Sequence, residues 1–147
     1  MKEMIKSPIL EEQKKQLERE ELGRRILGSV RNELYLKLKY LDLALGSLPF
    51  SPGRADPAGT DGGVLYFTPG SLMRLYQGSR AGVLRLYLHT LLHCLFAHPF
   101  DRRGRQKTLW DLACDVAVEA LIDSLHLRCA HVSRGAFGKS CTARLSG

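Results

Sequence analysis

The chain has 147 residues, and because 44% of them are hydrophobic it can bury the core of one domain. Its 22 Lys and Arg residues outnumber 15 Asp and Glu residues, for a formal net charge of +7, but they are spread along the chain and so do not indicate nucleic-acid or membrane binding. The four cysteines form no CxxC pair and no apolar run is long enough for a signal peptide or a membrane span, so we expect a cytoplasmic protein without a zinc ribbon or thioredoxin-type motif.

The first third of the chain predicts a supporting helix. Ser7-Pro8 has the form of an N-cap followed by proline in the first helical turn, and the charged residues 11–21 are typical of a solvated helix or a tail. Apolar residues then recur at steps of three and four from residue 26 until Gly46, which predicts a helix with a face toward the core. We therefore divide the chain into a charged N-terminal helix or tail (1–25), a domain (26–127) and a loop-like or truncated C-terminal tail (128–147).

The segment that follows is harder to interpret. Residues 48–63 are rich in Pro and Gly without clear periodicity, which indicates either a functional loop or a short strand that the pattern does not reveal. Residues 64–68, VLYFT, form the one clear predicted strand. Ser71 is a candidate cap for a short helix, and Ser79 is the candidate N-cap of the next one.

Residues 80–97 predict a helix that is apolar on nearly every side, which is typical of a buried helix. His89, Thr90 and His93 lie within it on one narrow arc. Two histidines at i and i+4 have Cβ atoms about 5–6 Å apart, so one metal ion can bind a nitrogen of each. The alternative is that both imidazoles are core groups that bond to their neighbours, because an unsatisfied buried polar group costs about 1–3 kcal/mol.

Pro99 is expected to end this helix. In a continuous helix His98 would point about 140° away from His93, so we interpret it as a polar group at a helix C-terminus. After a basic loop, the segment from Thr108 to Asp111 resembles a capping box that opens the next helix.

The helix after this loop carries four acidic residues at strict i+4 steps: Asp111, Asp115, Glu119 and Asp123. Such a stripe is usually the solvated face of an amphipathic helix. A connection of about ten residues, however, favours antiparallel packing against the histidine helix. Two His and one carboxylate form a common zinc set, with a fourth position for water that the metal activates for hydrolysis.

These two stripes together predict a metal site. His89 and His93 are two ligands, and Asp115 is the best third ligand because it lies in the middle of the second helix. Glu119, one turn further, is the predicted general base, with a fourth-ligand role or a hydrogen bond to a histidine N–H as its other possible roles. Capping explains Asp111, and solvent exposure explains the fourth acid of the stripe.

Three blocks of the sequence, TDGGVLYFTPGSL, YLHTLLHCLFAHPF and LWDLACDVAVE, resemble the zincin-like metallopeptidase domain found ahead of von Willebrand factor A-like domains in bacterial proteins. The resemblance covers residues 31–123. It implies an α+β, mostly helical zincin-like fold with a back helix, a small sheet, a metal-binding helix and an antiparallel closing helix. It also implies a Zn²⁺ cofactor, and it makes residues 64–68 the strand beside the cleft, to which an extended substrate would be added.

The sequence departs from this family at one position that matters. The usual motif is His-Glu-x-x-His with Glu as the general base, whereas Thr90 stands there in this chain, and a hydroxyl cannot act as a base near pH 7. One hypothesis is that Glu119 supplies the carboxylate from the next helix and that peptide hydrolysis is kept. The second is a non-catalytic module of the same fold, with or without metal, that binds a peptide or a partner protein. A nucleic-acid-binding domain is a third, weaker hypothesis, since the basic loop lacks interleaved aromatic residues.

Overall fold

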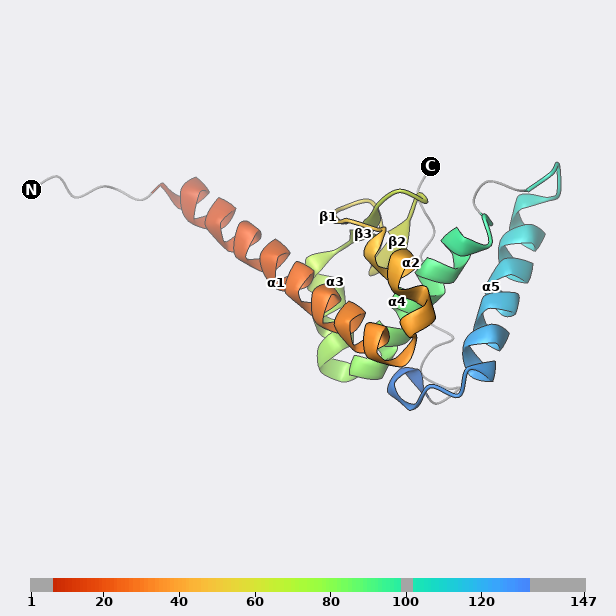
Figure 1. The fold of residues 1–147 in the computed structure, drawn as a ribbon. Helices are drawn as coiled ribbons and strands as arrows, with labels where there is room; N and C mark the ends of the chain where they lie inside the picture. The colour runs from red at the N-terminus through yellow and green to blue at the C-terminus, as the bar shows by residue number, and fades with distance from the viewer. Residues whose placement is uncertain (1–6, 99–101, 133–147) are drawn as a thin grey trace, which may run out of the picture.

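The computed structural model describes residues 7–98 and 102–132. Within them the chain is mostly helical with one small mixed sheet, which confirms the predicted α+β class (Figure 1). Its elements follow in the order α1 (Pro8–Lys37), η1 (Lys39–Leu41), α2 (Asp42–Gly46), β1 (Phe50–Pro52), β2 (Ala58–Thr60), β3 (Leu65–Phe67), α3 (Pro69–Gly78), α4 (Arg80–Leu95), α5 (Lys107–Ser124) and η2 (Arg128–Ala130). From residue 133 on, the predicted C-terminal tail lies outside the described residues.

The long helix α1 supports the fold with its second half. Pro8 occupies the first turn, as Ser7-Pro8 predicted, and the charged first half extends away from the rest of the molecule (Figure 1). From Gly23 onward one face of the helix is buried against the core. The expected boundary between residues 25 and 26 therefore lies inside one continuous helix.

The prediction of one helix up to Gly46 was wrong. Leu38 leaves the helical conformation with φ of −124° and ψ of 60°, and the chain continues through η1 and α2. This break turns α2 toward α1, so that Leu38 and Leu45 are both buried, with 3% and 0% of their surface exposed. The free energy gained by burying these two leucines therefore outweighs the helical hydrogen bonds lost at the break.

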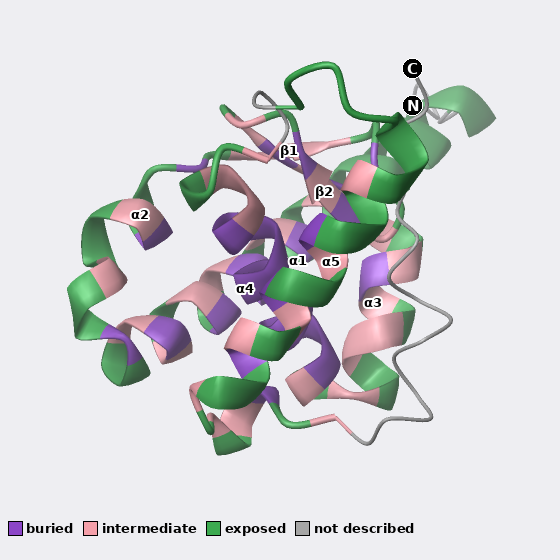
Figure 2. Ribbon diagram, turned by 90° about the vertical axis from the view of Figure 1, so that its right-hand side faces the viewer, coloured by how far each residue is buried: buried purple, intermediate pink, exposed green. Residues whose placement is uncertain are grey.

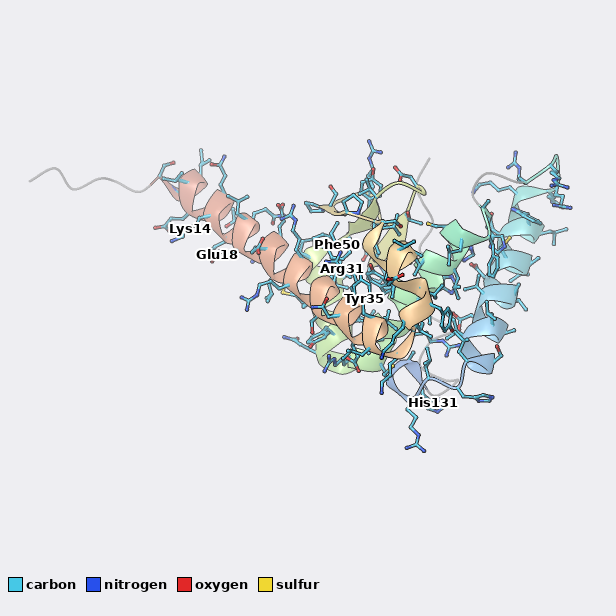
Figure 3. All side chains as sticks on the ribbon, viewed as in Figure 1. Lys14, Glu18, Arg31, Tyr35, Phe50 and His131 are labelled. Atoms are coloured by element: carbon cyan, nitrogen blue, oxygen red, sulfur yellow. The ribbon has the colours of Figure 1, made fainter. Side chains whose placement is uncertain are left out.

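The segment 48–63 contains two short strands, β1 and β2, on either side of β3. The sheet has the order β1-β3-β2, in which β1 pairs parallel and β2 antiparallel with β3. α1 packs on the sheet through Arg31, whose guanidinium carbon lies 4.9 Å from the centre of the Phe50 ring (Figure 3). The expected strand at 64–68 is thus confirmed as β3, but it is the central strand.

This topology corrects the expected substrate position. Because both edges of β3 are paired, residues 65–67 have no free edge to which a substrate strand could be added. In the described sheet the free edges belong to β1 and β2, and both edge strands contact α4, β1 through the Phe50 ring on Tyr87 and β2 along its length. The contact includes the Cys94 thiol, whose Sγ lies 3.5 Å from Thr60 Oγ1.

Helix α4 occupies the centre of the fold, where every residue from Gly82 to Leu92 is buried (Figure 2). Ser79 caps it as predicted, since its Oγ accepts a hydrogen bond from the Gly82 amide at 3.0 Å. The buried Tyr87 hydroxyl donates to the Leu45 carbonyl at 3.0 Å, and burial raises the pKa of this phenol to about 12. No helix in the described part of the chain is long and apolar enough to cross a bilayer.

Two predicted caps were wrong. The N-cap of α3 is Thr68 rather than Ser71, because Pro69 begins the helix earlier. The N-cap of α5 is Gln106, and its side chain makes no capping bond, so the expected capping box from Thr108 does not form. Asp111 instead pairs with Lys107 at 3.4 Å on the exposed face of α5.

A pair of glycines in α1 tests how tightly this helix packs on the sheet. A Cβ on Gly23 would lie 2.4 Å from Cε2 of Phe67, which is fully buried, whereas one on Gly28 would meet no atom within 4 Å. We expect Gly23→Ala to lower the free energy of unfolding by about 1–3 kcal/mol through overpacking. The matched Gly28→Ala should raise it by up to about 1 kcal/mol through helix propensity. Urea denaturation measures both, and equal effects of the two substitutions would contradict this packing.

Candidate metal centre

Two polar stripes face each other across the interface between α4 and α5. Each consists of three residues at steps of four: Arg85, His89 and His93 on α4, and Asp115, Glu119 and Asp123 on α5. The contacts run in opposite order, because His93 meets Asp115 at one end and Arg85 meets Asp123 at the other. The two helices are therefore antiparallel, as predicted.

Three side-chain atoms converge at one end of this interface. His89 Nε2 and His93 Nε2 are 2.9 Å apart, and Asp115 Oδ1 lies 3.4 Å from the first and 3.0 Å from the second. Ligand atoms around a tetrahedral zinc with bonds of about 2.0–2.1 Å are about 3.3–3.4 Å apart. The distance from Asp115 to His89 matches this value and the other two are shorter, so the three predicted ligands lie close enough together to share one metal ion.

Hydrogen bonds on the far side of each ring decide where the protons lie. Glu119 Oε1 is 2.7 Å from His89 Nδ1, and because a carboxylate only accepts, this nitrogen carries the proton. His93 Nδ1 is 3.0 Å from His98 Nδ1 and can donate to it. With these tautomers both Nε2 lone pairs face each other and a carboxylate oxygen, whereas a proton on His93 Nε2 would be donated to Asp115 Oδ1 at 3.0 Å. Either a proton or a metal ion therefore satisfies these three atoms.

The pKa values of the cluster reflect the same need. Burial alone would lower the pKa of His89, but its hydrogen bonds to Asp115 and Glu119 outweigh burial and raise the pKa above its ordinary value. Burial would raise the pKa of Asp115, but hydrogen bonds from His89 and His93 hold it well below its usual range. The pKa of Glu119 is lowered in the same way by His89 and Arg85. Two ionised carboxylates, Asp115 and Glu119, therefore flank the histidine pair and would stabilise a cation bound there.

Glu119 contacts the ring nitrogen of His89 that faces away from the converging atoms. Its second oxygen, Oε2, accepts from Arg85 Nε at 2.7 Å, so both carboxylate oxygens have partners. Of its three predicted roles, this arrangement favours the hydrogen bond to a histidine N–H; the role of general base stays a prediction. The Thr90 hydroxyl donates to the carbonyl of Leu86 at 2.9 Å and is thus bound to its own helix.

Solvent exposure increases across the site from α4 to α5. The side chains of His89, His93 and Asp115 are 9%, 18% and 41% exposed, so another molecule would approach beside Asp115. A cavity of about 190 Å³ borders the other end of the α4–α5 interface, where Arg85, Asp123 and His126 line it. None of the three predicted ligands lines this cavity, so it lies apart from the convergent atoms.

The expectation that His98 lies apart from His93 was wrong. Ala97 adopts a left-handed conformation with φ of 54°, and the His98 amide then donates to the His93 carbonyl at 3.1 Å. This turn folds the chain back, so that the two rings lie 5.1 Å apart. Trp110 Nε1 also donates to the His98 carbonyl at 3.1 Å, which ties this turn to α5.

Arg85 is the residue of this interface that the sequence analysis overlooked. It is 6% exposed and binds Glu119 and Asp123, so solvent exposure is not the whole role of Asp123. The signal was present, since an arginine four residues before His89 in an otherwise apolar helix requires an acidic partner.

The pKa shifts predict an acidic stability optimum for the metal-free cluster. A raised His89 pKa stabilises the fold below about pH 6.5, and this contribution is lost as pH rises through the folded value. Lowered carboxyl pKa values stabilise it above the ordinary values of 3.8 for Asp115 and 4.5 for Glu119, and these contributions are lost as pH falls through the folded values.

We therefore expect the difference in unfolding free energy between the unchanged protein and His89→Ala, measured with chelator, to be largest between about pH 4.5 and 6.5. Taking this difference separates His89 from His98, whose pKa is lowered by burial and by His93. Urea denaturation across pH 4–9 provides the measurement. A difference that grows from pH 6.5 to 8.5 would mean that His89 is neutral in the metal-free fold.

Comparison with known proteins points to the same chemistry. The family model with the description "Putative metallopeptidase domain" matches residues 41–135, which is well over half of the chain and includes α4 and α5. Neither the curated proteins nor the solved structures gave a match. The chain therefore belongs to this family, and its His89, His93 and Asp115 form a group that could hold a metal ion.

Proposed function

We propose that the domain binds Zn²⁺ through His89 Nε2, His93 Nε2 and Asp115 Oδ1. One observation carries this proposal, namely that three acceptor atoms lie within 3.4 Å of one another. Two imidazoles and one carboxylate match the ligand types that zinc prefers, and three protein ligands leave a fourth position open. The exposed side of Asp115 gives that position access to solvent.

The reaction that we propose is hydrolysis of a peptide bond. Zinc in such a site lowers the pKa of a bound water to about 7 and polarises a carbonyl group. The residues of the chain hold the site in shape, with Glu119 fixing the ring of His89 and His98 bonding to the ring of His93. The free edge of β2, which contacts α4, can pair with an extended peptide.

A second function, a non-catalytic module that binds a peptide or partner protein, also has a specific observation in its favour. Thr90 replaces the usual base and is bound to its own helix, and the carboxylate of Glu119 is engaged by two partners. Such a module would keep the metal without the reaction. Association with a von Willebrand factor A-like domain and a cytoplasmic location stay predictions.

Metal content tests the site directly. Protein purified without added metal should contain about one zinc per chain, and the His89→Ala/His93→Ala variant should contain none, because it lacks two of three ligands. Elemental analysis by mass spectrometry gives the ratio. His131→Ala is the matched control, since His131 is exposed and lies beyond η2 (Figure 3). An equal metal content in all three proteins would rule out the histidine pair as ligands.

Glu119→Gln separates the two roles of Glu119. A general base needs the carboxylate, so its loss would reduce peptide hydrolysis about 10²–10⁴-fold while zinc stays bound. A role as hydrogen-bond acceptor does not need the negative charge, because the amide oxygen of glutamine can still accept from His89. We expect the second result, with hydrolysis of a quenched fluorescent peptide library within about tenfold of the unchanged protein. If the zinc-loaded unchanged protein cleaves nothing, the non-catalytic module is the better description.

A further inference from the structure

We propose that Arg85 is a positioning residue that sets the affinity of the metal site, although it lies one helical turn away from the nearest ligand. It acts by holding Glu119, which in turn holds His89. This inference rests on the metal site proposed above. The contacts that carry it form a chain from Arg85 to Glu119 Oε2, and from Glu119 Oε1 to His89 Nδ1.

The first link is between two charged groups in a largely buried environment. The Arg85 side chain is 8% exposed and that of Glu119 is 26% exposed. Arg85 Nε lies 2.7 Å from Glu119 Oε2, and Nη2 contacts the same oxygen. Rotating the carboxylate away would weaken the pairing of a buried guanidinium, which is costly. Arg85 therefore restricts Glu119 to one orientation.

Further contacts fix the guanidinium independently of the Glu119 carboxylate. Nη2 also donates to Asp123 Oδ1 at 2.8 Å, and longer contacts of 3.5 Å reach the backbone carbonyls of Glu119 and Ala130. Arg85 is thus attached to α5 and η2 as well as to its own helix. The guanidinium provides a fixed point against which the Glu119 carboxylate is aligned.

The second link connects this alignment to the ligand atom. With Oε2 held by Arg85, Oε1 lies 2.7 Å from His89 Nδ1 and accepts its proton in a hydrogen bond. This bond fixes the tautomer and the ring orientation, so that Nε2 faces His93 and Asp115. Since Arg85 and His89 are four residues apart on α4, one carboxylate of α5 can bridge both.

Loss of such an outer partner typically reduces metal affinity about 10–100-fold. We expect Arg85→Met to weaken Co²⁺ binding by that factor, with a changed visible absorption spectrum of the bound ion. Arg85→Lys should recover part of the affinity, because an ammonium can bind Oε2 but cannot contact Asp123 and Glu119 together as a planar fork. Titration with Co²⁺ against a chromophoric chelator measures affinity without requiring any hydrolysis.

Arg80→Met is the matched control. Arg80 lies on the same helix and pairs with Glu33 of α1 at 2.5 Å, so its removal also breaks an ion pair between helices, but away from the site. We expect its Co²⁺ affinity to equal that of the unchanged protein within about twofold. Urea denaturation of each variant without metal shows whether it is folded. If Arg85→Met does not fold, the comparison relies on Arg85→Lys.

A double-mutant cycle with Glu119→Ala tests the route of the effect. If Arg85 acts through Glu119, Arg85→Met should change Co²⁺ affinity by less than about twofold once Glu119 is absent. An effect of the same size with and without Glu119 would overturn the inference, and so would unchanged affinity in Arg85→Met. Failure of the unchanged protein to bind Co²⁺ or Zn²⁺ is a different result, because it would overturn the proposed metal site itself and the inference with it.

Discussion

The interface between α4 and α5 depends on one constraint. Because α4 is buried along most of its length, every polar group on it has to find a partner on a neighbouring element. Arg85 and His89 are only 6% and 7% exposed, and α5 supplies carboxylates with the same four-residue spacing. Antiparallel packing brings the two sets into register. The ion pairs at one end and the converging nitrogen and oxygen atoms at the other both result from this single register.

Spacing on two long helices was sufficient to predict that Asp115 lies beside the histidine pair, because rigid helices carry a sequence period into space. Features that depend on short or unusual backbone were not predictable in the same way. His98 reaches the site only because Ala97 adopts a left-handed conformation that local sequence rules assign to glycine. The strands β1 and β2 have three residues each, which is too few for a period to appear. The burial of Arg85 becomes clear only when α5 is in place.

Thr90 shows how ligand geometry and acid–base chemistry are separable in this domain. Its hydroxyl donates to the Leu86 carbonyl on the preceding turn of α4, so a threonine at this position leaves no buried hydroxyl unsatisfied. The carboxylate of Glu119 is present nearby, but it is hydrogen-bonded to two partners, Arg85 and His89. A site of this kind can keep a metal ion in place while its capacity for proton transfer changes.

Helix α5 is attached to the domain by few apolar side chains. Its buried residues are Cys114, Val118 and Ile122, whereas Leu112 and Val116 on the same helix are about 60% exposed. The proposed ligand set takes two residues from α4 and one from α5, so a bound ion would cross-link this weakly packed helix to the core. Docking of α5 and occupancy of the site would then form one coupled equilibrium, visible as slower amide hydrogen exchange along α5 in the loaded protein. A bound ion would thereby stabilise the docked position of α5 on the core.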